Sequence, residues 1–289
     1  MKECVRLGNV YVADSGNVFS WDTKHFLTSK KYNVKVLSRK QHVRDISYYD
    51  FSSLLFSNNW FMRYDDKRQK LNILVNSTRI AFKKKISFDI KNNLIETELC
   101  SPTDPNKFDK LLFHPSDIII APYLHAAYSA GEILHCSAVK IKKKVYLFLG
   151  KSEAGKSTIS LLFDKFLAKN KIGSVINDEK NVISLTPYMV YGTPWSGEAA
   201  FRSGETGDLG GVFFIDKSEK CSIRRISNSE AFARFQQVHY APYGIKHFME
   251  QSADNFIKLI KDYQPKIFSF AKSEITPEWF IKNVVERES

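Results

Sequence analysis

The stretch Val145-Tyr146-Leu147-Phe148-Leu149-Gly150-Lys151-Ser152-Glu153-Ala154-Gly155-Lys156-Ser157-Thr158 decides the fold. Its first five residues are apolar and predict a buried strand, whereas residues 159–163 place apolar side chains on one face of a helix. Between these segments, Gly150, four further residues and the run Gly155-Lys156-Ser157 have the spacing of a phosphate-binding P-loop. The motif requires a strand before it and a helix after it, so the sequence predicts a nucleotide-binding site.

Each position of the predicted loop has a physical role. The glycines let the backbone turn tightly, so that successive N–H groups point at phosphate oxygens and the following helix adds its dipole. Lys156 is expected to neutralise the β- and γ-phosphates, and the Ser157 hydroxyl is expected to bind Mg²⁺. The predicted cofactor-binding residues are Gly150, Lys151, Ser152, Glu153, Ala154, Gly155, Lys156, Ser157 and Thr158.

A pair of acids follows the next predicted strand. Residues 172–176 form a strand-like run that ends in Asn177-Asp178-Glu179. Beside the loop, at the carboxyl ends of the strands, one acid can hold a metal ion while the other accepts a proton from an attacking hydroxyl. The alternative is a surface turn with two solvated charges.

His135 completes the predicted site. Residues 137–141 and 145–149 are typical of two strands joined by a lysine-rich turn, which places His135 on the strand that pairs with the P-loop strand. There it would reach a transferred phosphate, although spacing alone favours a core histidine. Glu198 is a further candidate ligand of the metal or substrate and Arg202 of the γ-phosphate. The alternative for both is a solvated loop residue.

Three blocks of the sequence resemble one known family. The blocks are Leu134-His135-Cys136-Ser137-Ala138-Val139, residues 147–158 and Asn177-Asp178-Glu179. Together they resemble the catalytic domain of HPr serine kinase/phosphorylase, which is related to ATP-dependent phosphoenolpyruvate carboxykinase. Residues 191–198 and 209–215 are similar to diverged HPr-kinase-like proteins of peptide-modification gene clusters, including lasso-peptide kinases. The resemblance covers about residues 117–227.

The resemblance implies a fold and a set of roles. It implies an α/β P-loop domain of the HPr-kinase/PEP-carboxykinase type at residues 116–289, and the strand-rich residues 1–115 before it are predicted to form a β-rich (α+β) domain of unknown function. The resemblance also implies ATP and Mg²⁺ as cofactors. The implied catalytic residues are Asp178 as general base, His135 beside the reacting phosphate, and Lys156, with Ser157 on the metal. Glu179 and Glu198 are the further candidate metal ligands.

The sequence departs from the bifunctional enzymes of that family at three points. Glu179 stands where they have a second Asp, Glu153 stands where their loop has Gly, and their carboxyl-terminal signature block is not found. Three questions therefore stay open: which of Asp178 and Glu179 is the base and which holds the metal, whether HPr is the acceptor, and whether the reverse phosphorolysis occurs. HPr kinases are oligomers, so a homo-oligomer is compatible with the resemblance. No motif in this sequence predicts the oligomeric state.

The amino-terminal part of the sequence is rich in strand formers. Residues 9–13 with 17–21, 60–64 with 71–75, and 86–90 with 94–98 are predicted to form hairpins. A loop with Pro102 and Pro105 is the predicted domain boundary. Residues 117–133 are mostly apolar and predict a largely helical run, and beyond them strands alternate with helices, as in α/β proteins.

Composition limits the location and the partners. The net charge is +12, with 20 basic and 13 acidic residues in 1–130 and 23 and 18 in 131–289, so no basic domain stands apart. Nucleic acid is therefore an unlikely partner, although dispersed positive charge can steer ATP or an acidic peptide to the protein. The four cysteines form no CxxC pair and no long apolar run occurs, which predicts a cytoplasmic protein without membrane attachment.

The sequence is compatible with three functions. The first is an ATP-dependent kinase that phosphorylates a hydroxyl, that of serine by resemblance, on a peptide or small protein. The second is a carboxykinase-like or small-metabolite phosphotransferase with the same core and another acceptor. The third is a non-catalytic nucleotide-binding regulatory module, which would bind ATP without turning it over.

Overall fold

The computed structural model describes residues 4–7, 10–14, 27–28, 34–40, 55–57, 60–77, 82–100 and 120–287. The chain divides into two compact units. The first comprises Met1–Arg6, Val10–Tyr128 and Pro242–Met249, and the second comprises Leu7–Asn9, Ser129–Ala241 and Glu250–Ser289. The predicted boundary between residues 115 and 116, and the two prolines that suggest it, lie outside the described residues.

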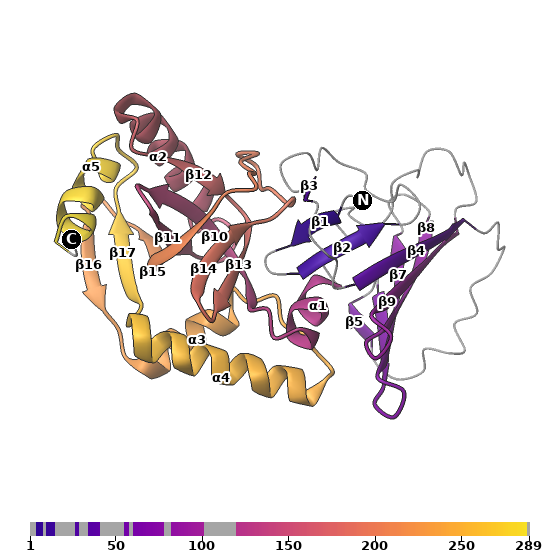
Figure 1. Ribbon diagram of the computed structural model, residues 1–289. Coiled ribbons are helices and arrows are strands. Elements are labelled where there is room, and N and C mark those ends of the chain that lie inside the picture. The colour runs from indigo at the N-terminus through magenta and orange to yellow at the C-terminus, as the bar shows by residue number, and fades with distance from the viewer. Residues whose placement is uncertain are drawn as a thin grey trace. The chain divides into compact units, whose positions relative to one another are not determined.

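Among the described residues up to Cys100, nine strands form a mixed sheet in the order β3-β1-β2-β4-β9-β8-β7-β6-β5 (Figure 1). The strands are β1 (Cys4–Leu7), β2 (Val10–Asp14), β3 (Leu27–Thr28), β4 (Val34–Lys40), β5 (Leu55–Ser57), β6 (Trp60–Asp65), β7 (Lys70–Ser77), β8 (Phe82–Asp89) and β9 (Leu94–Cys100). The antiparallel pairs β6–β7 and β8–β9 confirm two predicted hairpins. Strand β2 pairs in parallel with β4, and residues 17–21, its predicted partner, lie outside the described residues.

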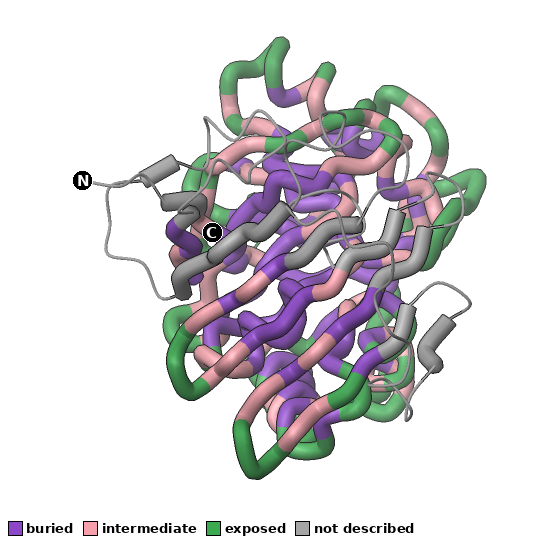
Figure 2. The backbone as a smooth tube through the Cα atoms, turned by 90° about the vertical axis from the view of Figure 1, so that its right-hand side faces the viewer, coloured by how far each residue is buried: buried purple, intermediate pink, exposed green. Residues whose placement is uncertain are grey.

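The period of two along a strand explains which side chains of this sheet are buried. Leu71 and Ile73 on β7, Ile86 and Phe88 on β8, and Ile95 on β9 are all fully buried. Figure 2 shows these buried stretches within the strands, with exposed residues at the hairpin turns. The alternation therefore sets the register of the central strands, because a slip by one residue would expose their apolar face.

The second unit has mixed α/β structure around a sheet of eight described strands. Its elements are β10 (Glu132–Ile141), β11 (Lys144–Leu149), α2 (Lys156–Asn170), β12 (Gly173–Asn177), β13 (Lys180–Leu185), β14 (Tyr188–Gly192), β15 (Thr206–Lys217), β16 (Ser222–Arg225), α3 (Asn228–Gln236), β17 (Lys266–Phe270) and α5 (Thr276–Phe280). Helix α4 (Lys246–Tyr263) begins in the segment assigned to the first unit and continues in the second, and a π-helical segment (Ile281–Val285) follows α5. The pairing order is β11-β10-β13-β14-β15-β17-β16, with β12 also on β10.

Strand β11 pairs a second time, in parallel with β15, so the strands β11, β10, β13, β14 and β15 form a closed ring of pairings. The antiparallel pair β10–β11 confirms the predicted hairpin with its lysine-rich turn. Because β11 and β15 run in the same direction, the segments that follow them emerge at the same edge of the sheet. That edge carries the loop after Leu149.

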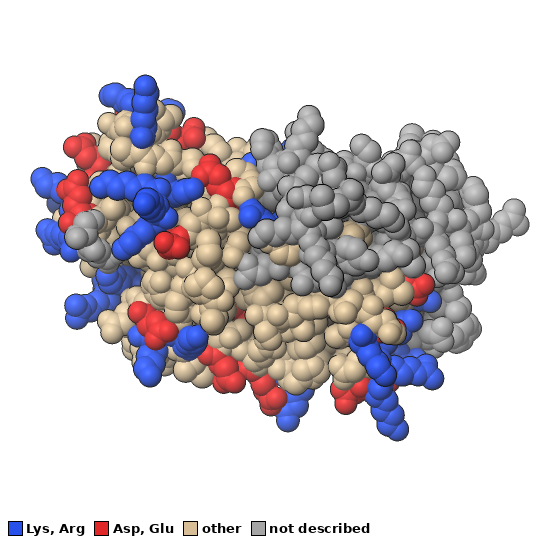
Figure 3. All heavy atoms as spheres, viewed as in Figure 1, with Lys and Arg blue, Asp and Glu red and all other residues tan. Residues whose placement is uncertain are grey.

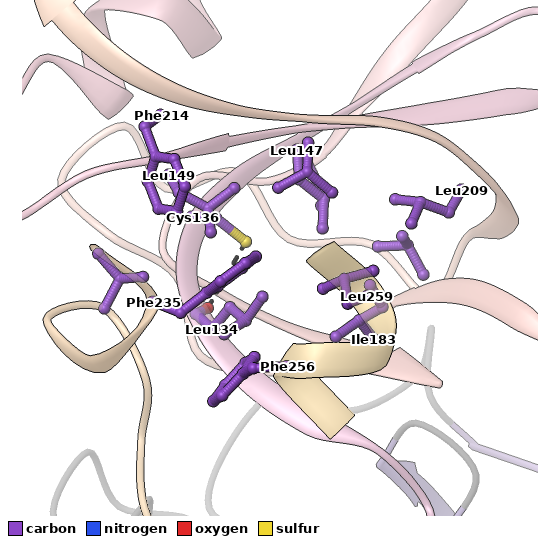
Figure 4. Close-up of a cluster of buried hydrophobic side chains, with 14 of the residues drawn as sticks. Leu134, Cys136, Leu147, Leu149, Ile183, Leu209, Phe214, Phe235, Phe256 and Leu259 are labelled. Atoms are coloured by element: carbon purple, nitrogen blue, oxygen red, sulfur yellow. Dashed lines mark hydrogen bonds between the residues drawn. The ribbon is translucent and has the colours of Figure 1, made fainter. Parts of the chain in front are cut away.

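Helices pack on both faces of this sheet (Figure 1). On one face, Phe235 of α3 and Phe256 and Leu259 of α4 belong to the same core cluster as Leu147 and Leu149 of β11, as Figure 4 shows. The opposite core cluster is formed by residues of β11, α2 and α5: Tyr146, Phe148, Ile159, Phe163, Leu167 and Phe280. Strand β11 is therefore buried on both sides, which explains its uninterrupted apolar run.

The predicted helical run over residues 117–133 is wrong for half of its described length. Helix α1 covers only Ala121–Ala127, and strand β10 follows soon after it. Ser129 and Gly131 interrupt the helix because both have positive φ angles, of 47° and 124°. The backbone of Gly131 also lies against β13, so that a Cβ there would be 2.1 Å from the carbonyl oxygen of Ile183.

The carboxyl-terminal elements match what their sequence predicts, with one shift. Helical spacing predicts helices at residues 229–235 and 256–260, which lie within α3 and α4, and the strand predicted at residues 266–271 corresponds to β17. Thr276, which precedes Pro277 and is therefore the expected cap of the last helix, is not the cap, because the N-cap of α5 is Ile275 and no side chain caps it. The Thr276 hydroxyl instead donates a hydrogen bond of 2.6 Å to the carbonyl oxygen of Ala271, which ties α5 to the end of β17.

Surface charge is mixed in the described part of the chain. On the face drawn in Figure 3, Lys and Arg side chains are interspersed with Asp and Glu. None of the described helices combines the length and the apolar character needed to span a membrane.

We expect Gly131→Ala to destabilise the second unit, because the new Cβ must displace the Ile183 carbonyl and adopt a positive φ. The expected loss in the free energy of unfolding, measured by urea denaturation, is about 2–4 kcal/mol. Ser129→Gly is the matched control: glycine tolerates the positive φ found there, which offsets the loss of the exposed hydrogen bond that Gln251 Nε2 donates to Ser129 Oγ, so stability should change by less than about 1 kcal/mol. Wild-type stability of Gly131→Ala would contradict this description of the β10–β13 junction.

Candidate functional site

Gly150 and Gly155 bound the loop between β11 and α2, and their surroundings explain why glycine is required at both positions. A Cβ on Gly150 would lie 2.6 Å from the Cβ of Ala154. Gly155 has a φ of 108°, and a Cβ on it would lie 2.7 Å from the ring of Phe270. The tight loop thus brings the first N–H groups of α2 close to the end of β11, an arrangement suited to binding an anion.

Lys156 is the first residue of α2, and its side chain turns back under the loop. The ammonium group donates hydrogen bonds of 2.9 Å to the carbonyl oxygens of Gly150 and Lys151. Only 6% of the residue is exposed, and burial lowers the pKa of the ammonium, an effect that Glu179 opposes most strongly. Lys156 therefore holds a positive charge within the curve of the loop.

A cleft of about 730 Å³ opens beside the loop. The predicted site residues that line it are His135, Ser152, Glu153, Gly155, Lys156, Ser157, Thr158, Glu179 and Glu198. Ser196, Gly197 and Lys217 complete its lining. The structure therefore brings together residues from the loop, from β10, from the acidic turn and from the segment after Trp195.

His135, Glu179 and Lys180 form the charged cluster of this cleft. His135 Nε2 lies 3.5 Å from Glu179 Oε2, and Lys180 Nζ donates a hydrogen bond of 2.9 Å to Glu179 Oε1. The hydrogen bond from His135, together with Lys180, lowers the pKa of Glu179 to about 2 against the opposing effect of burial. Such a carboxylate is ionised at neutral pH, which makes it a weak proton acceptor and a suitable ligand for a cation.

Asp178 is completely buried and does not line the cleft. Its Oδ1 accepts a hydrogen bond of 2.9 Å from the Gly197 N–H, and its Oδ2 accepts one of 2.9 Å from the Ala199 N–H. A Cβ on Gly197 would lie 2.9 Å from Asp178 Oδ2 and 2.8 Å from Glu179 Oε2, so only glycine allows this close approach. In this structure Asp178 anchors one wall of the cleft.

Asn177 is a second anchor, and the motif gave it no role. Its buried amide donates hydrogen bonds of 2.9 and 2.8 Å to the carbonyl oxygens of Thr193 and Trp195. Its Oδ1 accepts hydrogen bonds of 2.8 and 3.0 Å from the N–H groups of Glu179 and Lys180. An asparagine side chain commonly bonds to backbone groups two residues further on. The position of Asn177 directly before the two acids could therefore have predicted that it holds the acidic turn.

Besides Asp178, four predicted residues do not line this cleft. Arg202 is exposed, does not line the cleft, and forms an isolated backbone bridge with Asn177. Gly150, Lys151 and Ala154 line a second cavity of about 460 Å³, whose other walls come from β11, from β15 and from α3 with the residues that follow it. The loop therefore contributes to two cavities with different walls.

Lys217 lies in the cleft although no motif marks it. It is the last residue of β15, the parallel neighbour of the strand that leads into the loop. Ligands of α/β sheets bind outside the carboxyl ends of parallel strands. In the sequence Lys217 closely follows the apolar run of residues 212–215, which could have marked it as a residue at a strand end. The pairing of β15 with β11, which brings Lys217 to the cleft, could not be read from the sequence.

The donors of the cleft fit a nucleotide phosphate together with Mg²⁺. Ser157, Glu179 and Glu198 offer oxygen atoms, and Mg²⁺ is usually held by one or two carboxylates with the help of substrate phosphates. Within the described ranges, no three His, Cys, Asp or Glu side chains come close enough to hold a metal ion by themselves. Phosphate oxygens would complete the set of ligands.

Comparison with known proteins does not assign the chain to a family. A scan against models of protein families finds no match, and a search among curated proteins finds none either.

Glu179 makes the stability of the protein depend on pH. Its pKa of about 2 in the folded chain lies below the ordinary value of 4.5, so the ionised carboxylate stabilises the folded state. This contribution is complete above pH 4.5 and is lost as the pH falls towards 2. We expect Glu179→Gln to lower the free energy of unfolding at pH 6 by about 1–3 kcal/mol and to flatten its decline between these pH values.

The control for this measurement is Glu198→Gln, which removes an exposed carboxylate from the same cleft. Urea denaturation of the three proteins at several pH values gives the comparison. Parallel pH profiles for wild type and Glu179→Gln would show that the cluster with His135 and Lys180 does not stabilise the charged form.

Proposed function

We propose that the protein is an ATP-dependent kinase that transfers the γ-phosphate to a hydroxyl group, that of serine, on a peptide or small protein. The position of Lys156 carries the proposal: it is buried beneath a glycine-bounded loop in the cleft that also contains His135 and Glu179. A protein catalyses phosphoryl transfer mainly by positioning the reacting groups and by stabilising the charge on the phosphates. The cleft offers groups for both tasks.

Five residues of the cleft have roles in this proposal. Bound Mg²⁺ and ATP would supply the phosphoryl group and a polarised phosphorus atom. Lys156 and the N–H groups at the start of α2 would neutralise the phosphates, while Ser157, Glu179 and Glu198 would provide oxygen ligands for the metal. His135, held by its contact with Glu179, would lie beside the reacting phosphate.

The resemblance of the motifs supports the choice of acceptor. The loop, the histidine-bearing strand and the acidic pair resemble HPr serine kinase, and residues 191–198 resemble the peptide kinases related to it. That resemblance assigns Asp178 as the base that takes the proton of the hydroxyl. Asp178 is completely buried and accepts hydrogen bonds from the N–H groups of Gly197 and Ala199, so the assignment requires the segment after Trp195 to move when substrates bind.

The buried state of Asp178 favours a second candidate function, a nucleotide-binding regulatory module without transfer. If Asp178 serves only as an anchor, the carboxylate of the acidic turn that lines the cleft is that of Glu179, and its pKa of about 2 makes it a weak proton acceptor. The protein would then bind ATP and change its affinity for a partner. A kinase would convert ATP to ADP and a phosphorylated product, whereas this module would bind ATP without converting it.

The test of the kinase function is transfer of labelled γ-phosphate from ATP to serine-containing peptides in the presence of Mg²⁺. We expect Lys156→Met to reduce transfer by about 100-fold or more, because it removes charge from the phosphate site. Lys165→Met is the matched control on α2, since Lys165 is exposed and outside the cleft, and it should transfer normally. Tight ATP binding without any phosphorylated product or ADP would support the regulatory module instead.

The two roles of Asp178 predict different results for Asp178→Asn. In asparagine one carboxylate oxygen is replaced by an NH2 donor, which faces the N–H of either Gly197 or Ala199, so faster hydrogen exchange at one of these two amides is expected in either case. If Asp178 is also the base, transfer falls by about 100-fold or more while ATP affinity stays within about twofold. Transfer that continues at the wild-type rate, with faster exchange at one of the two amides, would leave Asp178 the role of anchor alone.

A further inference from the structure

Lys217 ends strand β15 at a position that the backbone fixes. In the parallel pairing of β11 with β15, Leu149 lies opposite Phe214, so the last residues of β15 run alongside the start of the loop. The strand end is held on its other side by β17, where Lys217 pairs with Phe270 and the next N–H, of Ser218, donates to the Phe270 carbonyl oxygen at 2.9 Å. Lys217 is therefore carried by a paired strand.

The side chain of Lys217 passes the last residue of the loop. A Cβ on Gly155 would lie 3.4 Å from Lys217 Cε, and Gly155 is the N-cap of α2. Lys217 lines the same cleft as Lys156, Ser157 and Thr158. The cleft thus receives one lysine from the loop and a second one from the neighbouring strand.

The two lysines differ in what they bind. Lys156 donates to two loop carbonyl oxygens, and Lys180, nearby, donates to Glu179. Within the described part of the chain, no hydrogen bond or ion pair is found for the Lys217 ammonium. Glu153 and Glu198 also line the cleft, yet neither is found within ion-pair distance of Lys217. An unpaired cation next to Lys156 and the positive end of α2 is a place where negative charge is stabilised.

We propose that Lys217 is a second cationic ligand of the nucleotide's phosphate chain, reaching it from β15 while Lys156 and the N–H groups of α2 reach it from the loop. The inference rests on the proposed function, because it takes the anion in the cleft to be the phosphate chain of ATP. One cation from the start of α2 and another from the end of β15 favour a ligand with several negative charges. Dependence on Lys217 therefore rises with the number of phosphate groups.

The experiment measures binding of ATP, ADP and AMP, each with Mg²⁺, to the full chain by isothermal titration calorimetry. The variants are Lys217→Ala, Lys217→Arg and the control Lys220→Ala, an exposed lysine three residues on that does not line the cleft. We expect Lys217→Ala to weaken ATP binding by about tenfold, ADP binding by less, and AMP binding by under about twofold. Lys217→Arg should restore most of the affinity for ATP, and Lys220→Ala should match wild type.

Each other outcome is informative. If wild type binds ATP and Lys217→Ala binds it equally well, the role of Lys217 is overturned while nucleotide binding stands. If the loss is the same for ATP and AMP, Lys217 does not act on the phosphate chain. If wild type binds no nucleotide, the proposed function fails and the inference fails with it. Thermal melting curves that match wild type show that the variants are folded.

Discussion

One backbone hydrogen bond joins the parts of the cleft: the Cys136 N–H donates to the carbonyl oxygen of Glu179 at 3.0 Å. Strand β10 exchanges partners at this point, pairing with β13 before Cys136 and with β12 from Ala138 onward, while its other edge carries β11. The bond fixes the acidic turn next to His135. A slip of one residue in β10 would turn His135 away from the cleft, so the register of one strand decides whether the charged cluster exists.

The anchors behind the acidic turn give the cleft its second wall. Asn177 and Asp178 together bind backbone groups of the segment from Thr193 to Ala199, using buried side chains. A buried carboxylate that accepts hydrogen bonds from two N–H groups is satisfied without an ion pair. The neighbouring carboxylate, that of Glu179, contacts His135 and Lys180 instead. Two adjacent acids thus serve different purposes, because one binds backbone N–H groups and the other binds charged side chains.

The sequence predicts those parts of the structure that local pattern determines. The loop after Leu149, three of the hairpins and the strand before the acids follow from apolar runs, turn residues and the glycine spacing. The helix expected over residues 117–133 fails because apolar residues suit a buried strand as well as a helix, and two positive φ angles divide the run. The roles of Asp178 and Lys217 depend on pairings between distant segments. No pattern around either residue specifies its partner.

The ring of strand pairings has a consequence for how the unit opens. Residues 144–149 pair with residues 208–214, so β11 is held by a neighbour on each edge and by packed side chains on each face. Strand β11 cannot separate from the sheet by fraying, because release requires two ladders and two cores to come apart together. Motion that admits a ligand is therefore confined to the loop and to the anchored wall, while the strand beneath them stays fixed.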